Sequence, residues 1–480
     1  MRSSGSSQFA GLVVGSDTDL VPAGVAWCHV ALLFSVLQRI SSMGVDAIFH
    51  SEFKPEPFWW EAYRPVSGAL VDVPRQVRVA IVGAGYGGLA TALELNKLGV
   101  EVVVLEAREL GHGASTRSGG AVSGGVNVGK SFAGKSLDPN SQHAHDLLMD
   151  AGDAFSTIER LVAEENIDCA WQKTGRFVGA WTPKHFAAQA ARVARLNEAA
   201  KSDCFMIPRD RQREEMASDY YHGGMVVERA ACLHPALYYK GLLDAVRRRG
   251  IAVCAEAPVE RMTRENTGWR VRTGRGDVLA DEVVIATNGY TGDVTPRLKR
   301  RLIPVASHII ATEELPPDLA AALIPKKRTL SDTRRVLTYY RMSPDHRRVI
   351  FGGRARFTQV TPAVSAPILH RFMTARFPQL KGVKLTHAWT GNVAFTFDAV
   401  PHMGRDDGMH YLLGCNGSGV AMMTYLGTQT ARKIAGVANY RCSFDAQEFP
   451  DHALYNGNPW FLPVMGAWYR MRDELDRAIG

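Results

Sequence analysis

The 480-residue sequence contains no pair of cysteines separated by two residues and no cysteine–histidine cluster with the spacing of a zinc site. Its seven cysteines are scattered, and their odd number argues against a full disulfide framework. The apolar stretch at residues 25–36 is shorter than the roughly 20 residues that cross a bilayer, and its flanks are unlike those of a signal peptide. We therefore predict a cytoplasmic protein with no bound metal and no membrane segment.

The length of the chain indicates more than one domain, with further segments at its amino-terminal end. A chain of 480 residues is longer than a single hydrophobic core usually grows, so two associated domains are expected. Residues 1–42 are predicted to form a disordered or loosely docked extension, with ordered structure beginning near Met43. Residues 43–76 include an aromatic and proline-rich segment around Phe58 and Trp59, and they are predicted to form an extended lead whose rings dock on the body of the protein.

The positive charge is concentrated in one segment. The chain carries a formal net charge of +8, and residues 297–356 contain 14 Lys and Arg against 5 Asp and Glu, a local excess of nine. Such a segment can attract an anionic substrate or a polyanion, or it can be an ordinary arginine-rich surface. No motif for binding nucleic acid accompanies it, so we expect no nucleic acid partner.

Residues 77–106 have the pattern of a strand, a helix and a second strand. Two apolar runs of strand length, at 77–82 and 100–105, enclose helical periodicity at 89–98. The turn Gly83-Ala-Gly85-Tyr-Gly-Gly88 joins the first strand to the helix. Its first glycine allows a tight bend, its second lets the backbone approach a diphosphate, and its third allows helix and strand to pack closely. With the helix amino terminus beside it, the turn predicts a dinucleotide-binding site. Further along the chain, residues 146–165 and 183–200 are predicted to form helices.

An acidic residue narrows the choice of dinucleotide. Glu106 lies 18 residues after Gly88, where its carboxylate can accept hydrogen bonds from ribose hydroxyls and would repel the extra phosphate of NADP. This unit alone leaves NAD and FAD open. Three further segments favour FAD, although each by itself can be an ordinary loop: the stretch from Gly113 to Gly120, the apolar run that ends in Ala286-Thr-Asn-Gly289, and the loop from Gly414 to Val420 before a helix.

Together, these motifs resemble those of the D-amino acid oxidase superfamily of FAD-dependent amine oxidoreductases. Within it, the chain most resembles the group of gamma-glutamylputrescine oxidoreductase and glycine oxidase. The resemblance runs from about residue 53 to residue 441, and the matching positions are 58–60, 83–88, 106–107, 113–120, 286–290, 351–354 and 414–420. The combination is specific to the superfamily, whereas a single glycine-rich motif is common.

The resemblance implies an α/β fold with two domains. A Rossmann-like, doubly wound FAD-binding domain would comprise residues 77–160, 225–300 and 390–440. A second α+β substrate domain, built on an antiparallel or mixed sheet, would comprise residues 161–224 and 301–389. Residues 441–480 match nothing in the family, and we expect them to form a C-terminal cover or an oligomer contact.

The resemblance also implies which residues contact FAD. Relatives with covalently attached flavin carry histidine where this chain has Ser118, so FAD is expected to bind noncovalently, with Cys415 and His112 as the remaining candidates for a covalent link. The expected contacts come from the glycine turn, the end of the second strand, the second glycine-rich stretch and the later loops. They are Gly83, Gly85, Gly88, Glu106, Ala107, Arg108, Gly113, Ser115, Thr116, Arg117, Ser118, Gly119, Val259, Thr287, Gly289, Asn416, Gly417, Ser418, Gly419 and Val420.

The implied chemistry is oxidation of a C–N bond in a small amine or amino acid, which can be anionic. Hydride passes from the carbon that bears the amine to flavin N5, and the imine is then hydrolysed. The flavin carries the difficult step, so this chemistry does not require an acid or base side chain. Reoxidation by O₂ would give hydrogen peroxide, as in oxidases of EC classes 1.4.3 and 1.5.3, and an acceptor other than O₂ is the alternative.

Candidate catalytic residues are His308 and Tyr340. His308 lies where members of this group turn a strand over the flavin, so it can hold or deprotonate the amine, and a histidine with a structural hydrogen bond is the alternative. Of the adjacent Tyr339 and Tyr340, one can offer its hydroxyl to the substrate while the other packs. Arg354 can clamp a carboxylate or form a structural ion pair, and Trp389 can line the pocket or pack in the core.

Three other functions remain open from the sequence. The first is an FAD-dependent dehydrogenase that acts on another C–H donor and passes electrons to an acceptor other than O₂. The second is an NAD-linked dehydrogenase built on the same strand–helix–strand unit. The third is a non-enzymatic flavoprotein module whose basic segment binds a polyanion. Flavin absorbance in the purified protein would exclude the second, and salt-sensitive binding to RNA would favour the third.

Overall fold

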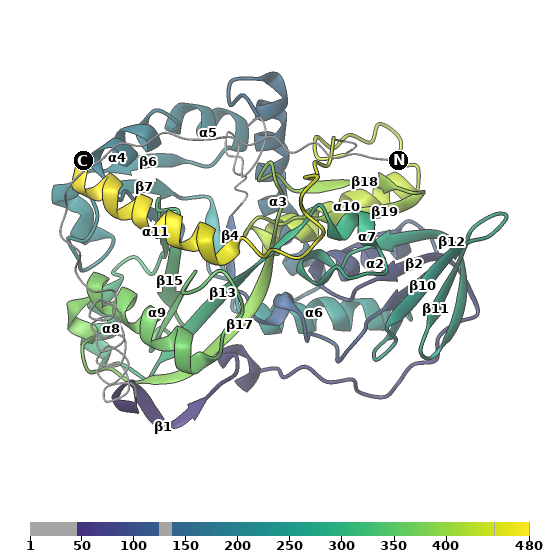
Figure 1. Ribbon diagram of the computed structural model, residues 1–480, viewed down its shortest axis with the longest axis horizontal. Coiled ribbons are helices and arrows are strands. Elements are labelled where there is room, and N and C mark those ends of the chain that lie inside the picture. Colours follow the sequence, from purple (N-terminus) through teal and green to yellow (C-terminus); the bar gives the residue numbers. More distant parts are fainter. Residues whose placement is uncertain (1–45, 124–136, 446, 480) are drawn as a thin grey trace, which may run out of the picture. The chain divides into compact units, whose positions relative to one another are not determined.

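A computed structural model of the chain describes residues 46–123, 137–445 and 447–479. Contacts divide the chain into Met1–Ala47 and Ile48–Gly480, and the sheets and helices below belong to the second unit. The extension predicted at residues 1–42 lies outside the described residues. Two large sheets, each assembled from stretches that are far apart in the sequence, form the framework of this unit (Figure 1).

The predicted strand–helix–strand unit lies in the middle of an eight-stranded sheet. Its first strand β2 (Gln76–Val82) has the parallel neighbours β3 (Val102–Leu105) and β12 (Gly276–Ile285). The strands are apolar runs because the middle of a parallel sheet is covered on both faces. The sheet continues with β9 (Ala252–Cys254) beyond β3, and with β10 (Val259–Arg264), β11 (Trp269–Thr273), β18 (His402–Asp406) and β19 (Met409–Leu413) on the side of β12.

The helices that share one hydrophobic core with β2 and β3 include α2 (Tyr86–Lys97), α3 (Gln142–Glu164), α6 (Pro235–Arg248) and α10 (Gly419–Ile434). α10 packs along α2, and its first three turns are buried. Ser141 caps α3, because its hydroxyl accepts a hydrogen bond from the backbone N–H of Ala144. The helix predicted from residue 146 therefore begins at Gln142.

The second sheet has nine strands and is mixed. Its order is β1 (Phe49–Lys54), β17 (Leu385–Phe395), β13 (Ile303–Thr312), β16 (Val349–Gly353), β15 (Thr338–Met342), β14 (Thr329–Asp332), β5 (Arg176–Gly179), β7 (Gly224–Val227) and β6 (Cys204–Ile207). β7 and β17 run beyond residues 224 and 389, where the sequence predicts the boundaries of the substrate domain. Helices α8 (Pro317–Leu323) and α9 (Pro362–Arg376) contribute to the core beneath this sheet.

One predicted helix is divided. Instead of a single helix over residues 183–200, the structure has α4 (Pro183–Ala190) and α5 (Val193–Ala200). Both helices pack on β6, but α4 also packs on β7, whereas α5 packs on α3. The two halves therefore differ in one of their packing partners. Smaller elements are β4 (Ala121–Ser123) paired with β8 (Ala230–Cys232), α7 (Pro296–Lys299), and the 3-10 helices η1 (Asp46–Ile48), η4 (Arg209–Glu214) and η6 (Pro378–Leu380).

Both flanks of the described chain pack on the body. The C-terminal helix α11 (Leu462–Ile479, yellow in Figure 1) is held by the buried carboxylate of Asp473, which accepts hydrogen bonds from the backbone N–H groups of Arg335 (3.0 Å) and Val336 (2.9 Å). Near the other end, the 3-10 helix η2 (Phe58–Glu61) buries Trp59 completely. The aromatic lead and the C-terminal segment thus form part of the packed structure.

Candidate functional site

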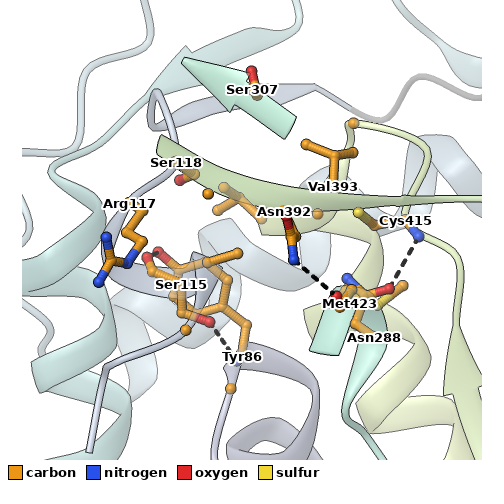
Figure 2. A pocket seen from close by; sticks show the side chains of 18 of the residues that line it. Tyr86, Ser115, Arg117, Ser118, Asn288, Ser307, Asn392, Val393, Cys415 and Met423 are labelled. Carbon is orange, nitrogen blue, oxygen red and sulfur yellow. Dashed lines mark hydrogen bonds between the residues drawn. The ribbon is translucent and has the colours of Figure 1, made fainter. Parts of the chain in front are cut away.

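A cavity of about 780 Å³ lies between loops of the eight-stranded sheet and one face of the nine-stranded sheet (Figure 2). Cofactor and ligand sites are typically ~300–1,000 Å³ in volume. Among the described residues that line it, Glu106 is the only carboxylate, and five are arginines: Arg108, Arg117, Arg176, Arg341 and Arg354. The cavity is therefore suited to ligands with negative charge.

The glycine turn after β2 forms the first wall. Gly83 has φ +105°, which L side chains rarely adopt, and a Cβ there would lie 3.0 Å from the carbonyl oxygen of Ala286. A Cβ on Gly88 would lie 1.9 Å from the carbonyl oxygen of Gly83. Gly83 and Gly85 line the cavity and Gly88 does not. The first two glycines thus leave room for a ligand, and the third lets α2 approach β2.

Glu106 ties the end of β3 to the glycine turn. Its carboxylate accepts hydrogen bonds from the backbone N–H groups of Ala84 (2.9 Å) and Arg108 (3.2 Å). Burial raises the pKa of this carboxyl, and the two N–H groups act in the opposite direction. A carboxylate has about four lone-pair sites, so Glu106 can also accept from ribose hydroxyls. Ala107, Arg108 and Val259 line the same part of the cavity.

The second glycine-rich stretch, which contains the 3-10 helix η3 (Ala114–Thr116), forms the adjoining wall. Gly113, Ser115, Arg117, Ser118 and Gly119 line the cavity. The hydroxyl of Ser115 accepts a hydrogen bond from the backbone N–H of Tyr86 (3.2 Å), which joins this wall to the glycine turn (Figure 2). Arg117 forms no ion pair in the described part of the chain, and burial lowers its pKa. Its guanidinium is therefore available to an anionic ligand such as a diphosphate.

Three indole N–H groups support this stretch from behind. Trp60 donates to the hydroxyl of Thr116 (3.0 Å), Trp389 to the carbonyl of Arg117 (2.8 Å) and Trp59 to the carbonyl of Ser118 (2.9 Å). Thr116 is buried, and its own hydroxyl donates to a backbone carbonyl. Neither Thr116 nor Trp389 lines the cavity. Both residues act on the site through the loop that they hold.

The two later loops complete the cofactor side. Thr287, Gly289 and residues 416–420 line the cavity, and α10 begins there at Gly419, so that its amino terminus favours negative charge. The Asn416 amide donates to the carbonyl of Gly414 (2.8 Å) and accepts from the N–H of Thr396 (3.1 Å), which gives it a role in shaping the loop. Asn288, in the 3-10 helix η5 (Asn288–Tyr290), accepts from the N–H of Gly414 (3.0 Å) and joins the two loops. It also accepts from the N–H of Cys415 (3.4 Å), as Figure 2 shows.

One face of the nine-stranded sheet forms the opposite wall. Successive side chains of a strand point to opposite faces, and paired residues of neighbouring strands point to the same face. Ile309 pairs with Gly352, Gly352 with Tyr339, and Tyr339 with Ser331, so these residues share the face that lines the cavity. Ser307 is on this face too, and its hydroxyl lies 2.9 Å from that of Tyr339. Burial raises the pKa of Tyr339 to about 12.

His308 and Tyr340 point to the other face. Tyr340 borders the cavity, but its ring packs in the core beneath the sheet and its hydroxyl donates to that of Tyr221 (3.3 Å). His308 is fully buried, does not line the cavity, and has no hydrogen-bond partner at either ring nitrogen within the described structure. The structure thus brings neither of the two predicted catalytic side chains into the cavity. Ser307 and Tyr339 take these positions, because the register of the strands turns them inward.

This placement predicts the effect of His308→Met. Burial lowers the pKa of His308 to about 4. Between pH 6.5 and 4 the unfolded chain therefore binds a proton that the folded protein does not, so stability is complete above pH 6.5 and falls as the pH is lowered. The variant should keep its activity. As the pH is lowered across that range, its free energy of unfolding should fall by roughly 3 kcal/mol less than that of the native protein. Unfolding curves at pH 7 and pH 4.5, with a turnover assay at pH 7, check this. Loss of turnover with normal flavin content would restore His308 as a catalytic candidate.

Arg354 follows β16 and faces the cavity. It donates to the carbonyl of Arg335 (2.9 Å), and its guanidinium lies over the ring of Phe395, 4.7 Å from the centroid. Burial lowers its pKa, and it forms no ion pair with a carboxylate among the described residues. The structural ion pair that the sequence leaves open for Arg354 is therefore not what holds it. The guanidinium retains N–H groups for a ligand.

Arg176, Ser307 and Asn392 are among the cavity residues that no sequence motif marks. All three lie on strands of the second sheet. Which of the two alternating sets of side chains on a strand faces the cavity depends on strand pairing, which a single sequence does not show.

The residues present fit FAD. A turn without room for a Cβ, a carboxylate able to accept from ribose, an arginine without an anionic partner and a helix amino terminus all border one side of the cavity. A polar sheet face borders the other. These features define the class of flavoproteins that hold a dinucleotide at a parallel sheet and a substrate at a second sheet.

The chain belongs to the family of FAD dependent oxidoreductases named DAO, whose family model matches residues 78–433. It is also 33% identical over 403 residues to a gamma-glutamylputrescine oxidoreductase of Escherichia coli (strain K12), covering 83% of this chain and 93% of the relative. The protein is thus an FAD-dependent oxidoreductase. The predicted resemblance, cofactor and fold class are confirmed, and FAD is selected over NAD.

Solved structures with the same fold include glycine oxidase from Geobacillus kaustophilus, with a TM-score of 0.65 and 17% identity over 79% of this chain and 99% of that chain. L-proline dehydrogenase from P. horikoshii has a TM-score of 0.64 and 17% identity over 77% of this chain and 96% of that chain. At this identity the likeness shows the fold alone. Among the helices that the structure describes, none has the length and apolar character needed to span a membrane.

Proposed function

We propose that this enzyme oxidises a C–N bond of an amine or amino acid and that the imine is then hydrolysed. The observation that carries the proposal is that Arg354, Tyr339 and Ser307, on the second sheet, share one cavity with the FAD-binding loops. The names of the relative gamma-glutamylputrescine oxidoreductase and of the structural neighbour glycine oxidase both refer to amines, which supports the same substrate class.

When bound, FAD supplies the redox chemistry, because its N5 accepts hydride from the carbon that bears the amine and O₂ then takes up the two electrons as hydrogen peroxide. In this proposal Gly83, Gly85 and Arg117 hold the diphosphate, and Glu106 holds the ribose. The amino terminus of α10 stabilises negative charge at the flavin ring. Ser118 stands where a covalent link would need histidine, so the cofactor is held noncovalently.

On the substrate side, Arg354 binds a carboxylate and Tyr339 orients the substrate. A guanidinium offers a planar fork of N–H donors that matches a carboxylate. The pKa of Tyr339 is about 12, so its hydroxyl stays protonated at neutral pH and serves as a hydrogen-bond donor rather than a base. Ser307, 2.9 Å away, fixes the direction of that hydroxyl.

The amine enters the cavity as the free base. Among the described residues on the sheet face of the cavity there is no histidine and no carboxylate to remove a proton. Hydride transfer from a neutral amine leaves a protonated imine, which needs only water to give the carbonyl compound and the released amine or ammonia. The side chains of this wall therefore bind and orient the substrate.

A panel of amines and amino acids tests the function. Anaerobic addition of a substrate is expected to bleach the flavin absorbance of the holoenzyme, and admission of air should restore it with formation of hydrogen peroxide. Restoration only by an added acceptor would assign a dehydrogenase. If no amine bleaches the flavin and a hydroxy acid does, the proposed C–N chemistry is wrong. The same holoenzyme, denatured with acid, should release its FAD into the supernatant.

The structure does not favour the polyanion-binding alternative. Arginines of the basic segment 297–356 are paired with carboxylates from other parts of the chain: Arg297 and Arg301 with Asp406, Arg328 with Glu215 and Glu228, and Arg335 with Asp473 and Asp476. Arg347 and Arg348 pair with Glu314 inside the segment. Much of the excess charge of this segment is thus compensated by nearby carboxylates.

A further inference from the structure

We propose that Arg176 is a second anion-binding subsite of the cavity, which takes a carboxylate of the substrate several atoms away from the oxidised C–N bond. The inference rests on the proposed function, and it names the substrate class: an amine that carries a remote carboxylate. Nothing in the family comparisons or the sequence motifs assigns a role to this residue.

Among the described residues, the hydrogen-bond partners of Arg176 are all uncharged. It begins β5, is partly buried and lines the cavity. Its Nε and Nη2 donate to the hydroxyl of Ser331 at 3.1 Å and 2.7 Å, and its Nη1 donates to the hydroxyl of Ser123 at 3.4 Å. A guanidinium has five N–H donors, so donors remain for a ligand. Burial lowers the pKa of Arg176, and no carboxylate in the described part of the chain pairs with it.

Two buried arginines near this sheet are neutralised by carboxylates, whereas Arg341 and Arg354 donate to backbone carbonyls instead. Arg376 lies 2.9 Å from the carboxylate of Asp332, and Arg328 lies 2.8 Å from that of Glu215, with all four side chains buried. An arginine taken out of water without a counter-ion costs stability. The fold meets that cost with carboxylates at Arg376 and Arg328 but not at Arg176. An anion that enters the cavity would supply the missing charge.

The position of Arg176 separates it from Arg354. Arg176 pairs with Thr329 on β14, and it shares the cavity face with Ser331 and Tyr339. β5 is three strands away from β16, after which Arg354 follows, and neighbouring strands are about 4.8 Å apart. The strand spacing alone therefore separates the two guanidinium-bearing positions by roughly 14 Å. Arg354 also follows the end of β16, so it is displaced along the strand direction as well.

The described part of the wall between the two arginines carries no carboxylate. It is lined by Thr329, Ser331, Leu337, Tyr339 and Arg341, and Arg341 donates to the backbone carbonyls of Gly120 and Leu233. The wall can therefore accompany an alkyl chain, and it offers no counter-ion to a second ammonium group. Arg176 would also repel the free cationic end of a diamine. The subsite thus selects amines with a terminal carboxylate over diamines and over uncharged amines of equal length.

The test compares two substrate series on the holoenzyme. Terminal-amino derivatives of butanoate, hexanoate and octanoate are set against alkylamines of the same chain lengths. In Arg176→Met, kcat/KM for the best amino carboxylate should fall about 10- to 100-fold, the value of a charged hydrogen-bonded contact, while that for the matching alkylamine stays unchanged. Arg176→Lys should recover part of the loss. Lys173→Met, an exposed residue three positions earlier that pairs with Glu159, is the control for general loss of positive charge.

A binding measurement keeps the subsite separate from the proposed function. Suberate, a dicarboxylate without an amine, is titrated into the holoenzyme and followed by the shift of the flavin absorption spectrum. Its affinity should fall by a similar factor in Arg176→Met and stay unchanged in Lys173→Met, whether or not any amine is oxidised. Equal losses in both substrate series, or unchanged suberate affinity in Arg176→Met, would overturn the proposal. Weaker FAD binding in that variant would also overturn it, because the guanidinium would then serve the cofactor.

Discussion

Gly88→Ala is expected to produce a protein that is purified largely without FAD and unfolds more easily. The added Cβ would lie 1.9 Å from the carbonyl oxygen of Gly83, which is backbone and has no rotamer to adopt. α2 must then move away from β2, and the turn that holds the diphosphate moves with it. We expect the free energy of unfolding to fall by about 3 kcal/mol. The ratio of flavin to protein absorbance and the thermal midpoint measure the two effects.

Gly292→Ala is the matched control. A Cβ at Gly292 meets no atom within 4 Å, and its φ is not in the left-handed region, so the same substitution should change neither quantity. At Gly88, which lies inside α2, helix propensity alone would favour alanine by about 1 kcal/mol.

A Gly88→Ala protein with full flavin content and an unchanged or higher thermal midpoint would show that the close approach of α2 and β2 is not needed.

Glu106→Ala should raise the dissociation constant for FAD about 100-fold or more, since each hydrogen bond to a charged group contributes about 1.5–3 kcal/mol. The substitution removes the acceptor for the ribose. It also releases the N–H groups of Ala84 and Arg108, which the carboxylate now holds at 2.9 Å and 3.2 Å. Titration of the apoprotein with FAD, followed by the quenching of flavin fluorescence, gives the constant. Glu106→Gln keeps one acceptor oxygen and should lose less.

Glu109→Ala provides the control for this position. Glu109 is three residues further along, pairs with His112 at 3.2 Å and does not line the cavity. Its removal should leave the affinity for FAD unchanged, because only an exposed ion pair is lost. If Glu106→Ala binds FAD as tightly as the native protein, the carboxylate does not hold the ribose and the assignment of this wall must be revised.

The cofactor side of the site was predictable because its determinants are local. The glycine turn, the strand that ends at Glu106 and the second glycine-rich stretch each follow from residues adjacent in the chain, and they all border one cavity. Thr116 and Gly88 were among the expected FAD contacts and instead shape the walls from behind. For Trp389 the sequence left lining and packing open, and the residue packs, with its indole N–H on the carbonyl of Arg117. Their side chains suit either role, and only the packed structure distinguishes the two.

The substrate side was less predictable because it depends on strand register. Adjacent residues of a strand point in opposite directions, so a choice between His308 and Ser307, or between Tyr340 and Tyr339, changes the chemistry completely. The pairing of β13 with β16 and of β15 with β14 makes that choice. For the same reason Arg176, which no motif marks, became visible only when β5 was placed beside β14.

By itself, the sequence determined a dinucleotide-binding turn, since such a turn is encoded in the spacing of a few consecutive residues. The combination of motifs along the chain, through its resemblance to a known family, predicted an FAD-binding α/β oxidoreductase. The tertiary structure alone decided which side chains face the substrate, where the helix predicted at residues 183–200 is divided, and which arginines have no counter-ion. These properties depend on pairings between strands and helices that are distant in the chain, and such pairings leave no signature within any single segment.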